Sequence, residues 1–393
     1  MSHEDDLIYY DALISNVENN NNVEPDLVFN ENREDALVGD PGNYKFSITR
    51  FVVDTLTLPV FIPTIMSTRN QGDTVDLNKT IYSVTVVYGT DASNVLKQEY
   101  LQYVPQDSIN TNSAPSMLSN GYPNYSTGYY NIYSTQYFVK LVNTALQTAI
   151  KGLSGTDPDG VSWSSSAQPL AFFSYDPSTQ LITLNAPKSL YDSSNSDLSN
   201  TIRIYMNHSM YRLFNSLPAI FTTDSDANGK IFQMHTNSFV GTSFYSLGNA
   251  PLINGGESST NIDVLAVNQE YVTTDTWSPV SSIVFTSNSI PIVSSDVSAV
   301  HQFINGQETT TGSTNIVEMT VTDFATADGF LPGVYYVPEA QYRWISLKSS
   351  RPLRNINLSV HWRNKKDGFL VPLRLSAGGS CSVKMLFKRI ASD

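Results

Sequence analysis

The sequence predicts an all-β protein, an antiparallel jelly-roll β-sandwich with one or two short helices. Only 15% of its 393 residues are charged, whereas an average soluble domain has about 25%. Its aromatic residues are mainly tyrosine, with 22, and phenylalanine, with 18, which favour strands. Short apolar and polar alternations recur between turn-forming residues, as in sandwiches. A helical bundle is excluded because exposed helix faces need many charges, and general disorder is excluded by the abundant aromatic residues.

Period-2 alternation predicts strands along most of the chain. Before the C-terminal region, the expected strands lie at 46–53, 80–88, 281–286 and 317–322. A hairpin is expected over 172–184, because Asp176-Pro177-Ser178-Thr179 separates two apolar runs with typical turn residues. These segments predict a sheet structure that runs almost from end to end.

The C-terminal region has the clearest alternation, with strands expected at 356–363, 369–375 and 381–388. In the last strand, Cys381, Val383, Met385 and Phe387 share one face, which we expect to point inward. Cys381 is the single cysteine of the chain, so no internal disulfide can form. Its position favours a small core residue over a nucleophile.

Two helices are expected. Residues 134–151 carry apolar side chains at helical spacing after Ser134, a good N-cap residue, and a shorter helix is expected over 208–217. We divide the chain into an acidic extended N-terminal arm, 1–42, and a jelly-roll sandwich, 43–393. Because the chain is long for one jelly roll, the sandwich contains either an inserted β-rich region at about 105–250 or a second jelly roll.

The net charge of −13 conceals a strong asymmetry. Residues 1–40 contain eleven acidic residues and one basic residue, whereas residues 343–393 contain eleven basic and two acidic residues. The acidic arm is expected either to order on contact with basic strands of another subunit or to remain a solubilising tail. The basic residues alternate with buried types along strands, so a solvated face is favoured over a nucleic-acid site. No apolar run is long enough to span a membrane.

No catalytic motif is found, and the five histidines lack metal-ligand spacing. We therefore expect neither enzymatic activity nor a cofactor. Asp224, Asp226 and Asn228 match the first half of a calcium loop, but His235 stands where the bidentate glutamate belongs. A hairpin turn at Asn228-Gly229 is the favoured interpretation, because this dipeptide is typical of such turns.

The remaining candidate residues are candidates for contacts with other proteins. A tyrosine-rich segment could stack on sugars, but a subunit interface is favoured, since aromatic, charge-poor surfaces are typical of interfaces. The interface candidates come from the arm, the tyrosine cluster and the basic strands: Glu4, Asp5, Asp6, Tyr125, Tyr129, Tyr130, Arg363, Lys365 and Lys366.

Several short strings, taken together and in this order, resemble a known family. They are Asp40-Pro41-Gly42-Asn43-Tyr44, Leu58-Pro59-Val60-Phe61-Ile62-Pro63, Tyr205-Met206-Asn207, Trp277-Ser278-Pro279-Val280, Tyr342-Arg343-Trp344-Ile345 and Val360-His361-Trp362. The set resembles the jelly-roll penton or minor capsid proteins of polinton-like viruses and virophages, from about residue 31 onward. The resemblance implies a structural protein of the virion, assembled inside the host cell. It also implies homopentamers at icosahedral vertices that contact the major capsid protein.

Three alternatives stay open from the sequence. Two jelly rolls would make the chain resemble a trimeric, double-jelly-roll major capsid protein. A carbohydrate-binding or receptor-binding spike would use the tyrosine-rich loop. A β-sandwich glycosidase would need two carboxylates that converge in space.

Overall fold

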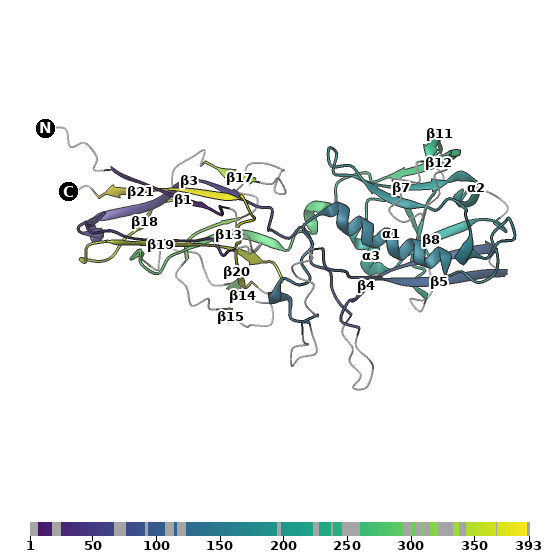
Figure 1. Cartoon of the computed structure of the whole chain (residues 1–393), viewed down its shortest axis with the longest axis horizontal. Coiled ribbons are helices and arrows are strands. Elements are labelled where there is room, and N and C mark those ends of the chain that lie inside the picture. The colour runs from purple at the N-terminus through teal and green to yellow at the C-terminus, as the bar shows by residue number, and fades with distance from the viewer. Residues whose placement is uncertain are drawn as a thin grey trace. The chain divides into compact units, whose positions relative to one another are not determined.

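The computed structural model describes residues 7–17, 25–66, 76–90, 93–106, 114–115, 123–194, 198–222, 228–236, 239–245, 260–293, 301–302, 308–309, 315–320, 333–337, 343–366 and 368–390 (Figure 1). The chain forms two compact units. Unit 1 contains Met1–Val60 and Pro279–Asp393, and unit 2 contains Phe61–Ser278. Unit 2 is therefore one continuous insertion in the chain of unit 1.

Unit 1 is an antiparallel β-sandwich, so the expected fold class is confirmed. Its first sheet has the strand order β1-β21-β3-β17, and β18 also pairs with β3. These strands are β1 (Leu7–Ser15), β21 (Ser380–Arg389), β3 (Tyr44–Asp54), β17 (Gly333–Tyr336) and β18 (Ile345–Ser346). Figure 1 shows β1, β21 and β3 in one layer and β13 and β19 in the other.

The second sheet of unit 1 has the order β16-β13-β19-β2, and β20 also pairs with β19. Its strands are β16 (Asn315–Thr320), β13 (Val280–Thr286), β19 (Asn355–Asn364), β2 (Val28–Asn32) and β20 (Leu370–Pro372). Two short strands, β14 (His301–Gln302) and β15 (Glu308–Thr309), pair with each other.

Aromatic rings join the two sheets of unit 1. The ring of Phe51 on β3 lies 4.9 Å from that of Phe285 on β13, and both side chains are fully buried. The four residues of β21 expected to point inward, beginning with Cys381, are also fully buried. The alternation of the last strand was therefore interpreted correctly.

The N-terminal region differs from the expectation. We expected residues 1–42 to form an arm outside the sandwich, but β1 and β2 are strands of its two sheets. β1 pairs with β21 over nine consecutive residues, from Leu7 opposite Lys388 to Ser15 opposite Ser380. The high density of acidic residues around β1 conceals its apolar alternation, which is what places it in the sheet.

Unit 2 contains two further antiparallel sheets and the helices. The first sheet, in the order β5-β4-β8-β10-β9, consists of β5 (Ser93–Gln102), β4 (Lys79–Thr90), β8 (Ile202–Met206), β10 (Phe232–Met234) and β9 (Ala219–Phe221). The second, in the order β11-β12-β7-β6, consists of β11 (Phe239–Tyr245), β12 (Thr260–Asn268), β7 (Ile182–Pro187) and β6 (Phe172–Tyr175). The helices are α1 (Thr135–Lys151), α2 (Lys188–Tyr191) and α3 (His208–Leu213).

Helix α1 contacts strands of both sheets in unit 2, namely β4 and β5 of the first and β6 of the second. It begins as expected, because the Ser134 hydroxyl accepts a hydrogen bond from the Tyr137 amide. The ring of Phe138 packs 4.6 Å from Phe61 and 5.1 Å from Trp277. None of the described helices is long and apolar enough to cross a membrane.

The expected hairpin over 172–184 is present, because β6 pairs with β7 from Phe172 opposite Asn185 to Tyr175 opposite Ile182. The insertion, however, is wider than the expected 105–250. β4 was interpreted as a sandwich strand, yet it pairs with β5 and β8 inside unit 2. Alternation identifies a strand but does not say which sheet it joins. The four-residue helix α2 was not expected.

Asn143 on α1 provides a test of the packing in unit 2. Its buried amide donates to the Phe173 carbonyl at 2.8 Å and accepts from the Phe173 amide at 2.7 Å. Asn143→Leu should lower the free energy of unfolding by about 1–3 kcal/mol for each backbone group left unpaired. Urea denaturation followed by circular dichroism measures this. The matched control is Thr144→Ala at the next, exposed position, and an equal loss in both variants would contradict the account.

Candidate assembly surface

The described part of the chain contains no cluster of three or more His, Cys, Asp or Glu residues that could hold a metal ion. Its surface, in contrast, carries a concentration of exposed apolar side chains on one strand. β1 is the last strand of its sheet among the described residues. The candidate functional site is therefore a surface for contacts with other proteins, and β1 is its centre.

The side chains of β1 alternate between the core and the solvent. Tyr10 and Ala12 are buried, whereas Tyr9 and Leu13 are 62% and 70% exposed. Leu7, which points the same way as Tyr9 and Leu13, is also exposed. β1 thus presents an apolar stripe on the outer face of the sheet, and large exposed apolar side chains grouped in this way mark contact surfaces.

The inner face of β1 is fixed by contacts with β2 and the residue after it. The Tyr10 hydroxyl donates a hydrogen bond to the Glu31 carboxylate. The Tyr10 ring meets the Phe29 ring edge-to-face at 6.0 Å, and the Arg33 guanidinium lies 5.9 Å from its centre. These contacts hold β1 in place, so the exposed stripe has a fixed position.

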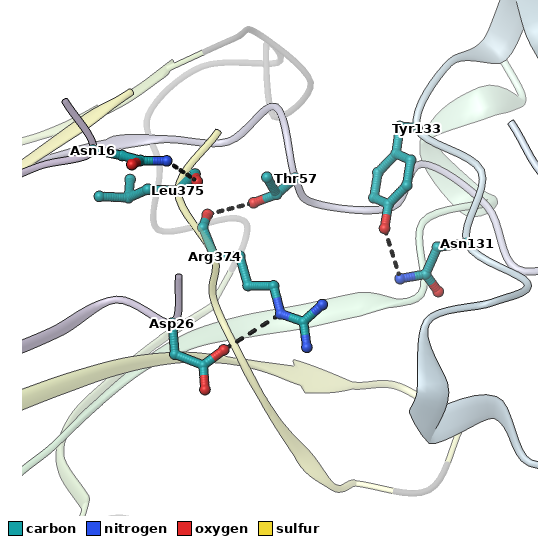
Figure 2. A network of polar contacts seen from close by, with 7 residues as sticks. All are labelled: Asn16, Asp26, Thr57, Asn131, Tyr133, Arg374 and Leu375. Carbon is teal, nitrogen blue, oxygen red and sulfur yellow. Dashed lines mark hydrogen bonds and ion pairs between the residues drawn. The ribbon is translucent and has the colours of Figure 1, made fainter. Parts of the chain in front are cut away.

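Two ion pairs join the acidic N-terminal region to the basic C-terminal region of the same chain. Asp11 lies 3.6 Å from Lys384, and Asp26 lies 3.3 Å from Arg374 (Figure 2 shows the second pair). All four side chains are substantially exposed, so each pair contributes at most about 1 kcal/mol. The expected contact of the acidic arm with another subunit is thus replaced, for Asp11 and Asp26, by partners in their own chain.

Hydrogen bonds fix the chain beyond the end of β1. Asn16 donates from Nδ2 to the carbonyl of Leu375 at 3.0 Å, and the Thr57 hydroxyl donates to the carbonyl of Arg374 at 2.6 Å (Figure 2). The backbone amide of Asn16 also donates to the Gly379 carbonyl at 2.9 Å. The segments after β1 and after β3 are therefore tied to the segment before β21.

Two described tyrosines of the tyrosine-rich segment are buried inside unit 2 rather than exposed on a contact surface. Tyr130 is 0% exposed and Tyr129 is also buried, which corrects the expected interface role. Their hydroxyls donate to the Leu77 carbonyl at 2.9 Å and to the Asn78 side chain at 3.2 Å. Burial raises the pKa of Tyr130 above its usual value.

Tyr125 and Tyr133 are partly buried and also make contacts within unit 2, so the interface prediction for Tyr125 stays open. The Tyr125 hydroxyl accepts a hydrogen bond from the Ile65 amide at 3.0 Å, and Asn131 donates from Nδ2 to the Tyr133 hydroxyl at 3.3 Å (Figure 2). These tyrosines hold the segments of unit 2 together. The sequence pattern could not show that these tyrosines make internal contacts, since a buried tyrosine cluster has the same composition as an exposed one.

The other interface candidates have different positions. Arg363 is buried and donates from Nη1 to the Gly368 carbonyl at 3.0 Å, so it holds the turn that follows β19 and is not available to a partner. Lys365 and Lys366 are exposed on that turn. Glu4, Asp5 and Asp6 lie outside the described residues.

The calcium candidate is described only in part, because Asp224 and Asp226 lie outside the described residues. The Asn228 carbonyl accepts a hydrogen bond from the Thr85 hydroxyl at 2.7 Å. Gly229 has a φ of +65°, and a Cβ there would lie 2.4 Å from the Gln98 side chain. β9 and β10 pair on either side of this segment, so the two strands of the expected hairpin are present, whereas residues 223–227 of their connection lie outside the described residues.

An apolar sandwich edge is typical of a surface that contacts other proteins. Comparison with known proteins identifies the class. Residues 8–389 match the family described as Sputnik minor capsid protein V18/19. Since this match covers nearly the whole chain, the chain belongs to that family and is a capsid protein of a virion. The resemblance inferred from the residues is thereby confirmed.

Two proteins of the Sputnik virophage are similar in sequence. The chain is 32% identical to the uncharacterized protein V18 over 152 residues, which cover 38% of this chain and 86% of V18. It is 24% identical to the structural protein V19 over 217 residues, which cover 55% of this chain and 92% of V19.

Two solved structures share the fold. A chain in the cryo-EM structure of the Sputnik virophage has a TM-score of 0.75 and 24% identity, and the likeness covers 98% of this chain and 99% of that chain. The mavirus penton protein has a TM-score of 0.57 and 15% identity, with the same coverage. The insertion is therefore part of the shared fold.

Cys381 should be inert in the folded protein. Its side chain is fully buried, and burial raises the pKa of the thiol to about 12. Because the thiolate is the reactive form, a thiol reagent at pH 8 should not modify Cys381 until urea unfolds the chain. Mass measurement before and after unfolding checks this. Rapid modification of the native protein would contradict the placement of β21 in the core.

Proposed function

We propose that the chain is a penton protein that forms homopentamers at icosahedral vertices and contacts the major capsid protein. In this proposal it acts by assembly and not by catalysis. The observation that carries the proposal is the match of residues 8–389 to a minor capsid family. The fold shared with the mavirus penton protein along 98% of the chain supports the vertex position.

The surface of unit 1 supports a role in assembly. A subunit of a closed shell must bury its sides against neighbours, and interfaces are depleted in charged residues and enriched in aromatic ones. The chain has only 15% charged residues, and the edge strand β1 exposes Tyr9 and Leu13. In a ring of five identical subunits, each subunit would cover the stripe of its neighbour.

The two charged groups of interface candidates keep a place in this proposal. Glu4, Asp5 and Asp6 precede β1 in the sequence, and Lys365 and Lys366 are exposed after β19. We propose that these residues contact neighbouring proteins of the shell. In this proposal, residues 1–6 make the contact with another subunit that the sequence suggested for the whole acidic arm.

Native mass spectrometry of the full chain tests the proposed oligomer. We expect a complex of five chains of 43.4 kDa each. A complex of three chains would favour the alternative of a major capsid protein. A monomer would contradict the proposed self-association. A glycan array serves as a second measurement, since sugar binding by a single chain would favour the alternative of a receptor-binding spike.

Deletion of residues 1–6 tests the terminal contact separately. Because β1 begins at Leu7, the shortened chain keeps the whole strand and should fold with an unchanged melting temperature. If these acidic residues contact a neighbour, the pentamers of the shortened chain should dissociate at lower salt, and on dilution at a higher protein concentration, than those of the full chain. Pentamers of unchanged stability would contradict the contact. Glu270→Gln at an exposed position of unit 2, which also makes the chain less acidic, is the control for charge alone.

A further inference from the structure

The backbone of β1 offers a second row of hydrogen-bonding groups. Asn16 donates to Gly379, which is opposite to it in the register of β1 and β21. In an antiparallel pair, residues whose backbone groups bond to the partner strand alternate with residues whose backbone groups point the other way. Ile8, Tyr10, Ala12 and Ile14 therefore direct their backbone groups to β21. Leu7, Tyr9, Asp11, Leu13 and Ser15 therefore direct theirs away from the sheet.

The pairing of β21 with β3 leads to the same assignment of the backbone groups. The Ile390 amide donates to the Asn43 carbonyl at 2.7 Å, which continues the pairing of Arg389 with Tyr44. Even-numbered residues of β21 thus face β3, and odd-numbered residues face β1. The two observations agree on which residues of β1 direct their backbone groups away from the sheet.

Protected edges usually carry features that prevent pairing with another strand, such as lysine, proline, bulges or short length. β1 carries one charged side chain, Asp11, which is paired with Lys384 of the neighbouring strand. It is nine residues long, contains neither lysine nor proline, and pairs with β21 without a register shift. Another long edge strand in the described residues, β5, contains a lysine, Lys97, and has an irregular register. β1 therefore stands out as an edge open to strand addition.

A second copy of this chain can provide the added strand in two ways. In the first, β1 of each copy pairs with the other around a two-fold axis. Asp11 is the middle residue of β1, so a fully overlapped pair would place two carboxylates opposite each other, which is destabilising. This charge arrangement disfavours the symmetric pair.

In the second way, the opposite edge of the same sheet takes part, which among the described residues is formed by β17. β1, β21, β3 and β17 are successively antiparallel, so β17 runs opposite to β1. Copies related by rotation about an axis along the strands would thus bring β17 antiparallel to β1 of the next copy. β17 and the residue after it expose Tyr335 and Val337, which match the apolar stripe of Leu7, Tyr9 and Leu13.

We propose that β1 of one subunit pairs with the β17 edge of the next subunit, so that the sheet β1-β21-β3-β17 continues around the ring. This inference rests on the proposed homopentamer and specifies its contact. Main-chain hydrogen bonds would provide the affinity, and the alternating apolar side chains would fix the register.

Cysteine cross-linking in the assembled protein tests the pairing. Under mild oxidation, Leu13→Cys combined with Tyr335→Cys, or Tyr9→Cys combined with Tyr335→Cys, should give covalent multimers up to the complete ring. The matched control combines Leu13→Cys with Leu96→Cys, an exposed leucine on β5, and should give none. Dimers from Asp11→Cys alone would overturn the proposal in favour of the symmetric pair, which places Asp11 of one copy opposite Asp11 of the other.

Substitution of the edge provides an independent test. Leu13→Pro removes an amide that the ladder with β21 does not use, and proline is tolerated at such edge positions. We expect a nearly unchanged melting temperature and at least about a tenfold higher concentration for half-assembly, equivalent to the loss of ~1.4 kcal/mol. Leu13→Lys should act likewise, whereas Leu96→Lys should assemble normally.

The outcomes separate this inference from the proposed function. Pentamers that form normally in the Leu13→Pro and Leu13→Lys variants and give no Leu13–Tyr335 or Tyr9–Tyr335 cross-link would overturn the strand pairing alone. A wild-type chain that stays monomeric would overturn both.

Discussion

The antiparallel pairing of the two ends of the chain is the interaction on which unit 1 depends. β21 lies between β1 and β3, so the last strand joins the first strand to the strand that precedes the insertion. Its inward side chains, including Val383 and Met385, are fully buried in the core. Because the paired residues are separated by nearly the whole chain, the entropy cost of closing this sheet is high. The sandwich can therefore form only when the complete C-terminal strand is available.

This pairing also explains the charge asymmetry of the sequence. The acidic and basic ends lie beside each other in one sheet, where Asp11 is opposite Lys384 in the register. Exposed ion pairs add little stability, so the main contribution comes from the nine-residue ladder and from the buried Tyr10 and Ala12. The opposite charges instead reduce the repulsion that either end would have alone.

Local patterns predicted the local structure well. The alternation around Cys381 identified β21 and its buried face, and Ser134 marked the beginning of α1. The sheet membership of β4 could not be predicted in this way, since pairing partners are set by the whole chain rather than by local sequence. β1 was missed because composition was averaged over forty residues, although its own nine residues contain one charge.

The candidate surface was predicted less well than the fold. Tyr129 and Tyr130 were expected at an interface because aromatic, charge-poor segments favour one, but a buried cluster has the same composition. Arg363 alternates with apolar residues as an exposed residue would, yet its guanidinium holds a turn. The exposed stripe of Tyr9 and Leu13 depends on which face of β1 is covered, and only the structure of the sheet decides that.

Hydrogen exchange at β1, read at residue level by mass spectrometry, tests the central claim most directly. In isolated subunits, the amides of Ile8, Tyr10, Ala12 and Ile14 should be protected, because they bond to β21. The amides of Tyr9, Asp11 and Leu13 should exchange quickly in the subunit and become protected on assembly. Rapid exchange along all of β1 in the subunit would contradict its place in the sandwich. Unchanged exchange of the outward amides on assembly would contradict its role as the contact edge.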